Sequence, residues 1–157
     1  MHEAETAGLL EELHEPPRRL AELVRDHAEP AWRMPRRTGE WTAAETLAHI
    51  RAADAIVTPR LMQIAVRDEP FLPAYDERAW QEVADFVRSP VAALVQTFAA
   101  LRGELLHALA RLSPEAWQRS GIHEERGRLS MREIAEGIVA HEREHLDQIE
   151  SALAGPA

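Results

Sequence analysis

SMREIAEGIVAHEREHLDQI, residues 130–149, is the stretch that decides the fold, because it predicts a long amphipathic helix with two histidines on its apolar face. Ser130 followed three residues later by Glu133 forms a capping box, in which each side chain bonds a backbone N–H at the helix start. One stripe of this helix contains Ile134, Ile138, His141, His145 and Ile149. Two imidazoles within an aliphatic stripe are unfavourable unless something satisfies them, and a shared metal ion would do so.

His141 and His145 lie one helical turn apart, so both imidazoles leave the same face of the helix. Neutral imidazole is a common ligand of zinc, nickel and similar ions. The run also matches the His-Glu-x-x-His motif of zinc metalloproteases, in which Glu142 would activate a bound water. A metzincin would continue with glycine at 148 and histidine at 151, where this chain has Gln148 and Ser151. A third ligand is therefore expected upstream.

His49 is the upstream candidate, in a helix predicted over residues 42–66. Thr42 and Glu45 form a second capping box, and Trp41 directly before it is expected to act as a hydrophobic staple or core anchor. The apolar side of the helix that includes His49 also contains Ile50, Ala53, Ile56 and Val57. A lone histidine on such a face is more often a hydrogen-bonded core residue than a ligand. The pair at 141 and 145 favours a ligand here.

Composition indicates an all-α protein with a single domain over residues 1–157. Of the 157 residues, 45% are apolar and only 5% aromatic, which favours helices over sheet. A formal charge of −9 disfavours a nucleic-acid partner. The absence of a long apolar run predicts no membrane association and a soluble cytoplasmic protein. Without cysteine, any thiol must come from another molecule.

The remaining chain predicts two more long helices, one near the start of the chain and one that follows a long connection. Leucines at helical spacing indicate a helix before and after Pro16, with a break or kink at that proline. Residues 68–75 form a long connection, followed by a short helix over residues 76–86. Ser89 and Pro90 begin the third main helix, and residues 121–127 are expected to be loop. Leucine-rich and alanine-rich surfaces leave room for a homodimer.

Three segments together resemble the DinB-like family of metal-binding four-helix bundles. They are GEWTAAETLAH (39–49), DEPFLPAYD (68–76) and HEREHLDQI (141–149). The resemblance runs from about Leu9 to Leu153. It implies an up-up-down-down four-helix bundle with a long crossover connection, short extra helices, and a divalent metal ion held by His49, His141 and His145. It also implies relatives among thiol-dependent enzymes, including bacillithiol transferases and a mycothiol-dependent isomerase.

Three histidine ligands leave a position on the ion open for water or a small-molecule substrate, as in catalytic sites. A metal-dependent enzyme is the leading hypothesis, with zinc or nickel as the ion and a thiol-dependent transferase as one form of it. The alternatives are a metal-dependent hydrolase, a non-catalytic binding bundle, and a bundle that uses the metal only for stability. Glu142 is expected to be an exposed acid or a neighbour of the ligands rather than a base. His123 is expected to be a solvated loop residue, although it could approach the open end of the bundle.

Overall fold

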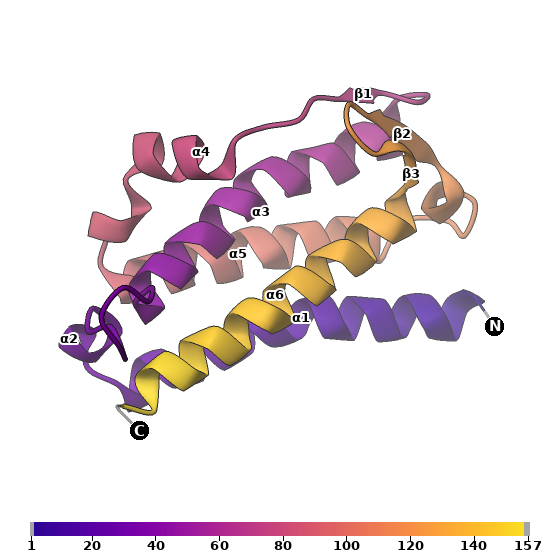
Figure 1. Cartoon of the computed structure of the whole chain (residues 1–157). Helices are drawn as coiled ribbons and strands as arrows, with labels where there is room; N and C mark the ends of the chain where they lie inside the picture. The colour runs from indigo at the N-terminus through magenta and orange to yellow at the C-terminus, as the bar shows by residue number, and fades with distance from the viewer. Residues whose placement is uncertain (1, 156–157) are drawn as a thin grey trace.

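Four long helices pack side by side in the computed structural model, which describes residues 2–155. They are α1 (His2–Asp26), α3 (Ala43–Val66), α5 (Val91–Leu109) and α6 (Met131–Leu153). Helices α1 and α3 each pack against both α5 and α6. Helix α1 therefore lies diagonally opposite α3, and α5 lies diagonally opposite α6 (Figure 1). The predicted four-helix bundle is confirmed.

The helices run in the order up, down, down, up, so the up-up-down-down order implied by the resemblance is wrong. The connection between α1 and α3 contains the short helix α2 (Glu29–Trp32) and stays at one end of the bundle, which makes these two helices antiparallel (Figure 1). The connection from α3 to α5 instead returns along the length of the bundle. It contains β1 (Phe71–Leu72), α4 (Glu77–Ala84) and η1 (Phe86–Arg88), and it is the predicted long crossover.

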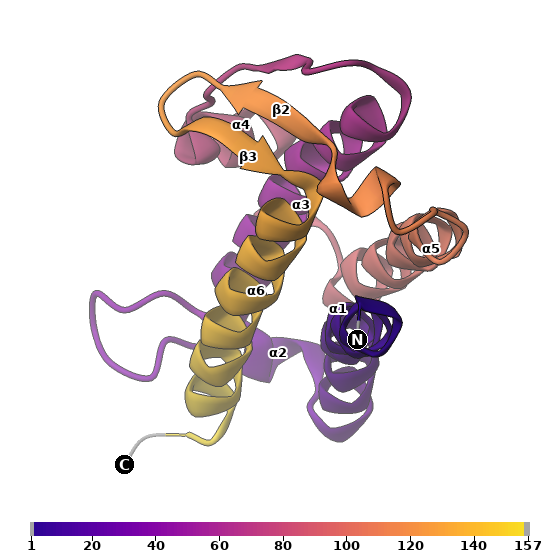
Figure 2. The ribbon, with the colours of Figure 1, turned by 90° about the vertical axis from the view of Figure 1, so that its right-hand side faces the viewer.

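A small sheet covers one end of the bundle, where the sequence predicted only loop. Strand β2 (Ser120–His123) pairs with β3 (Gly127–Ser130) in antiparallel fashion and with β1 in parallel fashion. The hairpin leads directly into α6 (Figure 2). Gly127 at φ +72° supplies the left-handed residue that closes the tight turn. The expectation of loop over residues 121–127 is therefore wrong for residues 121–123 and for Gly127, while residues 124–126 form the turn between the strands. The 3₁₀ helix η2 (Ala116–Gln118) precedes β2.

Helix α1 continues through Pro16 and Pro17, so the predicted break is also wrong. Pro17 has no N–H to donate to the carbonyl of Leu13 one turn earlier. The guanidinium of Arg102 donates to that carbonyl instead, at 2.9 Å. A side chain from α5 thus replaces the missing backbone bond, which reduces the penalty of a proline inside the helix.

Two apolar clusters form the core, and a layer of buried charge lies between them along the helices. One cluster includes Leu61 of α3, and the other includes Leu47 of the same helix. The residues between them along α3, α5 and α6 include Asp54, Arg102 and Glu142, which are all buried. The capping boxes of Thr42 and Ser130 are both present, so the starts of α3 and α6 are as predicted.

Candidate metal centre

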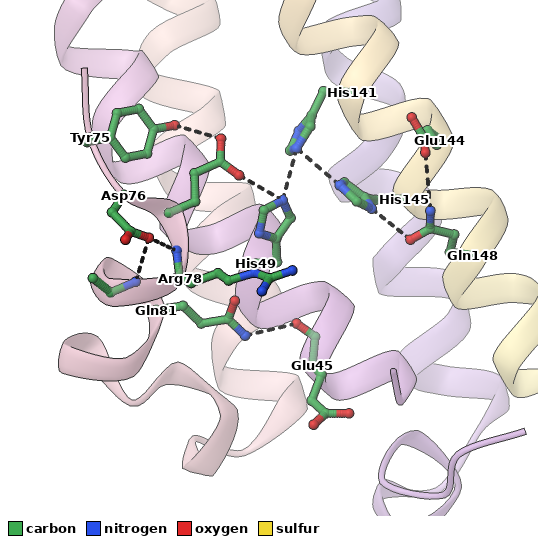
Figure 3. Close-up of polar contacts among 12 residues, drawn as sticks. Glu45, His49, Tyr75, Asp76, Arg78, Gln81, His141, Glu144, His145 and Gln148 are labelled. Carbon is green, nitrogen blue, oxygen red and sulfur yellow. Dashed lines mark hydrogen bonds and ion pairs between the residues drawn. The ribbon is translucent and has the colours of Figure 1, made fainter. Parts of the chain in front are cut away.

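His49 of α3 and His141 and His145 of α6 point their rings toward one another (Figure 3). The Nε2 atom of His141 lies 3.1 Å from the Nε2 atoms of both His49 and His145. The candidate ligand atoms of the group all lie within 4.8 Å of one another. The structure therefore brings together the three histidines that the sequence singled out, and this group could hold a metal ion.

The donor set fits a first-row divalent ion. Nitrogen ligands about 2.1 Å from a shared ion lie roughly 3–3.5 Å apart, which is close to the two observed Nε2 separations. Burial, followed by the neighbouring His145 and His49, lowers the pKa of His141 to about 4. Burial and then His145 also lower the pKa of His49. Both rings are thus neutral near pH 7, which is the form that binds metal.

Gln148 orients one of the three rings. Its Oε1 lies 2.8 Å from Nδ1 of His145, and its Nε2 donates to Glu144 at 3.4 Å (Figure 3). Because an amide oxygen can only accept, the ring of His145 donates from Nδ1, and in the neutral tautomer that this bond selects the free lone pair is on Nε2. That lone pair faces His141, as a metal ligand requires.

Glu77, in the first turn of α4, brings a carboxylate to the three histidines. Its Oε2 lies 3.4 Å from Nε2 of His49, and its Oε1 accepts a hydrogen bond from the Tyr75 hydroxyl at 3.5 Å. Burial and then Glu77 raise the pKa of Tyr75 to about 12, so the phenol stays protonated. No motif in the sequence singled out Glu77 as a site residue. Its only signal was its place directly after Asp76, which caps α4.

Glu142 is buried, and no hydrogen bond among the described residues joins it to the three histidine rings. Its exposed fraction is 3%, and both of its oxygens accept from Arg102. Burial raises the pKa of Glu142, while the bonds from Arg102 oppose the rise. The expectation of an exposed acid is wrong because α5 places an arginine against this position of α6. The expectation that Glu142 is not a free base gains support from that pairing.

A cavity of about 290 Å³ opens beside His141. Its lining includes Arg60, Tyr75, Glu77 and His123. His123 has an exposed fraction of 9%, so the expectation of a solvated loop histidine is wrong. Strand β2 carries this ring toward the bundle, and the sequence could not show this without the hairpin.

Trp41, directly before the start of α3, departs from its expected place. Its exposed fraction is 43%, so it does not anchor the core. Its ring meets the ring of His49 edge-on, with 5.6 Å between the ring centroids. Trp41 therefore shields one side of the histidine group rather than the apolar interior.

The fold and the site together define a class of protein, a four-helix bundle with a group of histidines beside a cavity. The sequence profile of the DinB superfamily matches residues 12–149. The chain belongs to the DinB superfamily.

Several known proteins are similar to this chain. A protein of Oceanobacillus iheyensis, named as a putative metal-dependent hydrolase, is 28% identical over 143 residues, which cover 90% of this chain and 82% of that protein. YfiT of Bacillus subtilis carries the same description and is 24% identical over 138 residues, covering 87% of this chain and 78% of YfiT. The solved structure of YfiT, described as a probable metal-dependent hydrolase with an unusual four-helix bundle topology, superposes with a TM-score of 0.83 at 20% identity. That match covers 94% of this chain and 85% of YfiT, and it confirms the fold.

Proposed function

We propose that the chain is a metal-dependent hydrolase that acts on a small molecule. In this proposal His49, His141 and His145 hold one divalent ion, zinc or nickel. The observation that carries the proposal is the convergence of three imidazole Nε2 atoms beside a cavity of about 290 Å³. The three relatives are each named a putative metal-dependent hydrolase, which supports the choice of reaction.

A bound ion of this kind supplies a Lewis acid that polarises a substrate and lowers the pKa of water or of a thiol. Residues of the chain other than the three histidines have the remaining roles. Gln148 holds the ring of His145 in the ligating orientation. Glu77 offers Oε2 as the proton acceptor nearest the ligand nitrogens, at 3.4 Å from His49. Glu142 takes no part in proton transfer because Arg102 occupies both of its oxygens.

A thiol-dependent transferase is the second candidate. The chain contains no cysteine, so the sulfur would belong to a low-molecular-weight thiol used as a cosubstrate. A second hollow is lined in part by Trp41 and Gln148, which contact His49 and His145, although none of the three histidines lines it. Two hollows beside one metal site would accommodate two reactants. A non-catalytic metal or small-ligand binding bundle is what remains if neither reaction is found.

Elemental analysis of untagged protein, followed by turnover assays with esters, amides and thiol–electrophile pairs, tests the proposal. We expect a divalent metal at about one equivalent, hydrolysis that stops on chelation and returns with added zinc or nickel, and a large loss of metal in His49→Ala, His141→Ala and His145→Ala. The exposed His107 provides the control variant His107→Ala, which should keep its metal. Turnover only with a thiol would select the transferase. Metal-independent turnover, or a full metal content in all three variants, would rule out the proposed centre.

Three further sequence predictions belong with this proposal, and they concern location, nucleic-acid binding and oligomeric state. None of the helices among residues 2–155 has the length and apolar character needed to cross a membrane. A cytoplasmic location and the lack of a nucleic-acid partner stay predictions from the sequence. So does the homodimer, which sedimentation at tens of micromolar protein would test.

A further inference from the structure

Arg60 is a buried cation without a carboxylate partner among residues 2–155. Its exposed fraction is 8%, and it lines the cavity beside His141. Its guanidinium donates to the carbonyl of Pro73 and lies over the ring of Tyr75, with 4.9 Å from Cζ to the ring centroid. Neither contact neutralises its charge. A buried charge that no anion compensates is unfavourable, so its position calls for an explanation.

The other two buried arginines show the contrast. Arg51 donates to Asp54 at 2.9 Å, and Arg102 is paired with both Asp54 and Glu142. The cavity is also lined by Asp54 and Glu142, but these two acids are already committed to Arg51 and Arg102. The inner acids of the cavity therefore do not compensate the charge of Arg60.

His123 adds a hydrogen-bond donor to the same cavity. Its Nδ1 accepts from the backbone N–H groups of Glu125 and Arg126, at 3.2 and 3.4 Å. The neutral ring must then carry its proton on Nε2. Burial, and then the charges of Arg60 and Arg126, lower the pKa of His123, which keeps the ring neutral near pH 7. The Nε2–H group has no acceptor among the described residues.

Two further acids, Glu77 and Glu125, line the cavity, and neither forms an ion pair with Arg60 among the described residues. Much of the remaining wall is apolar. Val57 of α3, Leu129 of β3, and Ile134 and Ile138 of α6 contribute to it. A cavity of about 290 Å³ with such a wall suits the apolar body of a small molecule. The cationic and donor groups of Arg60 and His123 suit a charged group attached to that body.

We propose that Arg60 and His123 form a subsite for an anionic group, a carboxylate or a phosphate, on a small molecule with an apolar body. Arg126, at the tip of the hairpin, adds a second positive charge to the lining. The binding of the anion stands on these contacts alone. Its role in substrate recognition rests on the proposed function, because His141 of the candidate metal centre lines the same cavity.

Calorimetric titration of chelator-stripped protein tests the subsite without any contribution from a metal ion. The probes are hexanoate, hexyl phosphate and the neutral hexanamide, which share one apolar body. We expect at least one of the anions to bind about tenfold more tightly than the amide, as a charge-assisted contact should give. A preference for one anion over the other identifies the charged group. If neither anion binds better than hexanamide, or if no probe binds at millimolar concentration, the proposal is wrong.

Three variants assign the preference to its residues. Arg60→Gln removes the charge and should abolish the preference, while Arg60→Lys keeps the charge and should retain part of it. In His123→Asn the amide oxygen replaces Nδ1 as an acceptor, but the Nε2 donor is lost. This variant should weaken the binding of the anions severalfold and leave the binding of hexanamide unchanged. If Arg60→Gln fails to fold, the other two variants still decide the outcome.

Arg119 offers a matched control, because it also donates to backbone carbonyls next to the hairpin. Its guanidinium bonds the carbonyls of Ile64 and Arg67, and it does not line the cavity. Arg119→Gln should lower the melting temperature and leave the anion preference unchanged. A preference that survives in Arg60→Lys, Arg60→Gln and His123→Asn alike, or that is lost in Arg119→Gln, would show that these two residues do not form the subsite.

Discussion

Arg102 donates two hydrogen bonds to the carboxylate of Glu142, at 2.9 and 2.5 Å, and both side chains are almost fully buried. The same guanidinium donates to Asp54 at 3.1 Å and to the carbonyl of Leu13 at 2.9 Å. These partners belong to α6, α3 and α1, so one side chain of α5 connects all four long helices. The pair next to His141 is therefore part of the scaffold of the site.

Glu142→Gln should destabilise the fold and leave the metal content intact. The amide cannot neutralise Arg102 at this buried position, and breaking a buried ion pair typically costs about 3–5 kcal/mol. Asp54 stays available to Arg102, so we expect a loss of about 3 kcal/mol in the free energy of unfolding, measured by urea denaturation. If Glu142 were a protease-type base, the same variant would keep its stability and metal but lose turnover, because the amide cannot accept a proton from water.

Glu136→Gln is the control for this variant, because Glu136 is an exposed acid on the same helix. It should change the free energy of unfolding by less than about 0.5 kcal/mol. The assignment of Glu142 to the scaffold fails if Glu142→Gln keeps its stability and metal but loses turnover by several orders of magnitude.

Gln148 makes a separate prediction about metal affinity. Gln148→Leu removes the acceptor from Nδ1 of His145, and the loss of such an orienting partner typically weakens metal binding about 10–100-fold. Competition with a chelator of known affinity measures the change. Gln148→Glu keeps an acceptor and should restore most of the affinity, whereas Gln96→Leu on the exposed side of α5 should have no effect. Unchanged affinity in Gln148→Leu would separate this residue from the metal centre.

Local patterns carried most of what the sequence could predict. The capping boxes at Thr42 and Ser130 depend only on residues three positions apart, and both are present. The spacing of His141 and His145 is equally local. His49 is a candidate because it lies on the apolar side of a capped helix, and the resemblance to a family supports it, but nothing in the sequence alone states that α3 packs against α6. The structure brings its ring within 3.1 Å of His141.

Three features that the sequence missed depend on contacts between distant segments. Helix α1 passes through Pro17 because Arg102, 85 positions later in the chain, bonds the carbonyl of Leu13. Glu142 is buried because that same arginine reaches it from α5. His123 lines a cavity because strand β2, only four residues long, pairs with β1. Short-range periodicity contains no record of such partners.

Gly121 should tolerate no side chain, because β1 and β2 approach closely at this point. A Cβ atom added there would lie 2.7 Å from Cδ1 of Leu72 and 3.1 Å from the carbonyl oxygen of Pro70. Gly121→Ala should therefore lower the free energy of unfolding by about 1–3 kcal/mol. Gly103 lies in the middle of α5, where an added Cβ would meet no atom within 4 Å beyond the neighbouring residues and the local helix backbone, so Gly103→Ala should instead raise it by about 0.5–1 kcal/mol. Equal effects in the two variants would contradict the close pairing of β1 with β2.

Removal of the metal should leave the bundle folded. All four long helices contribute to the two apolar clusters, and the buried charges around Arg102 satisfy one another without an ion. An ion present at about 100 times its dissociation constant adds only about 2.7 kcal/mol. For a chain of this size, that corresponds to a fall of roughly 5–10 °C in melting temperature on chelation. Circular dichroism of stripped protein at 25 °C should keep its full helical signal, and His145→Ala should show no response to the chelator. Loss of the helical signal on chelation would instead make the metal a structural element of the fold.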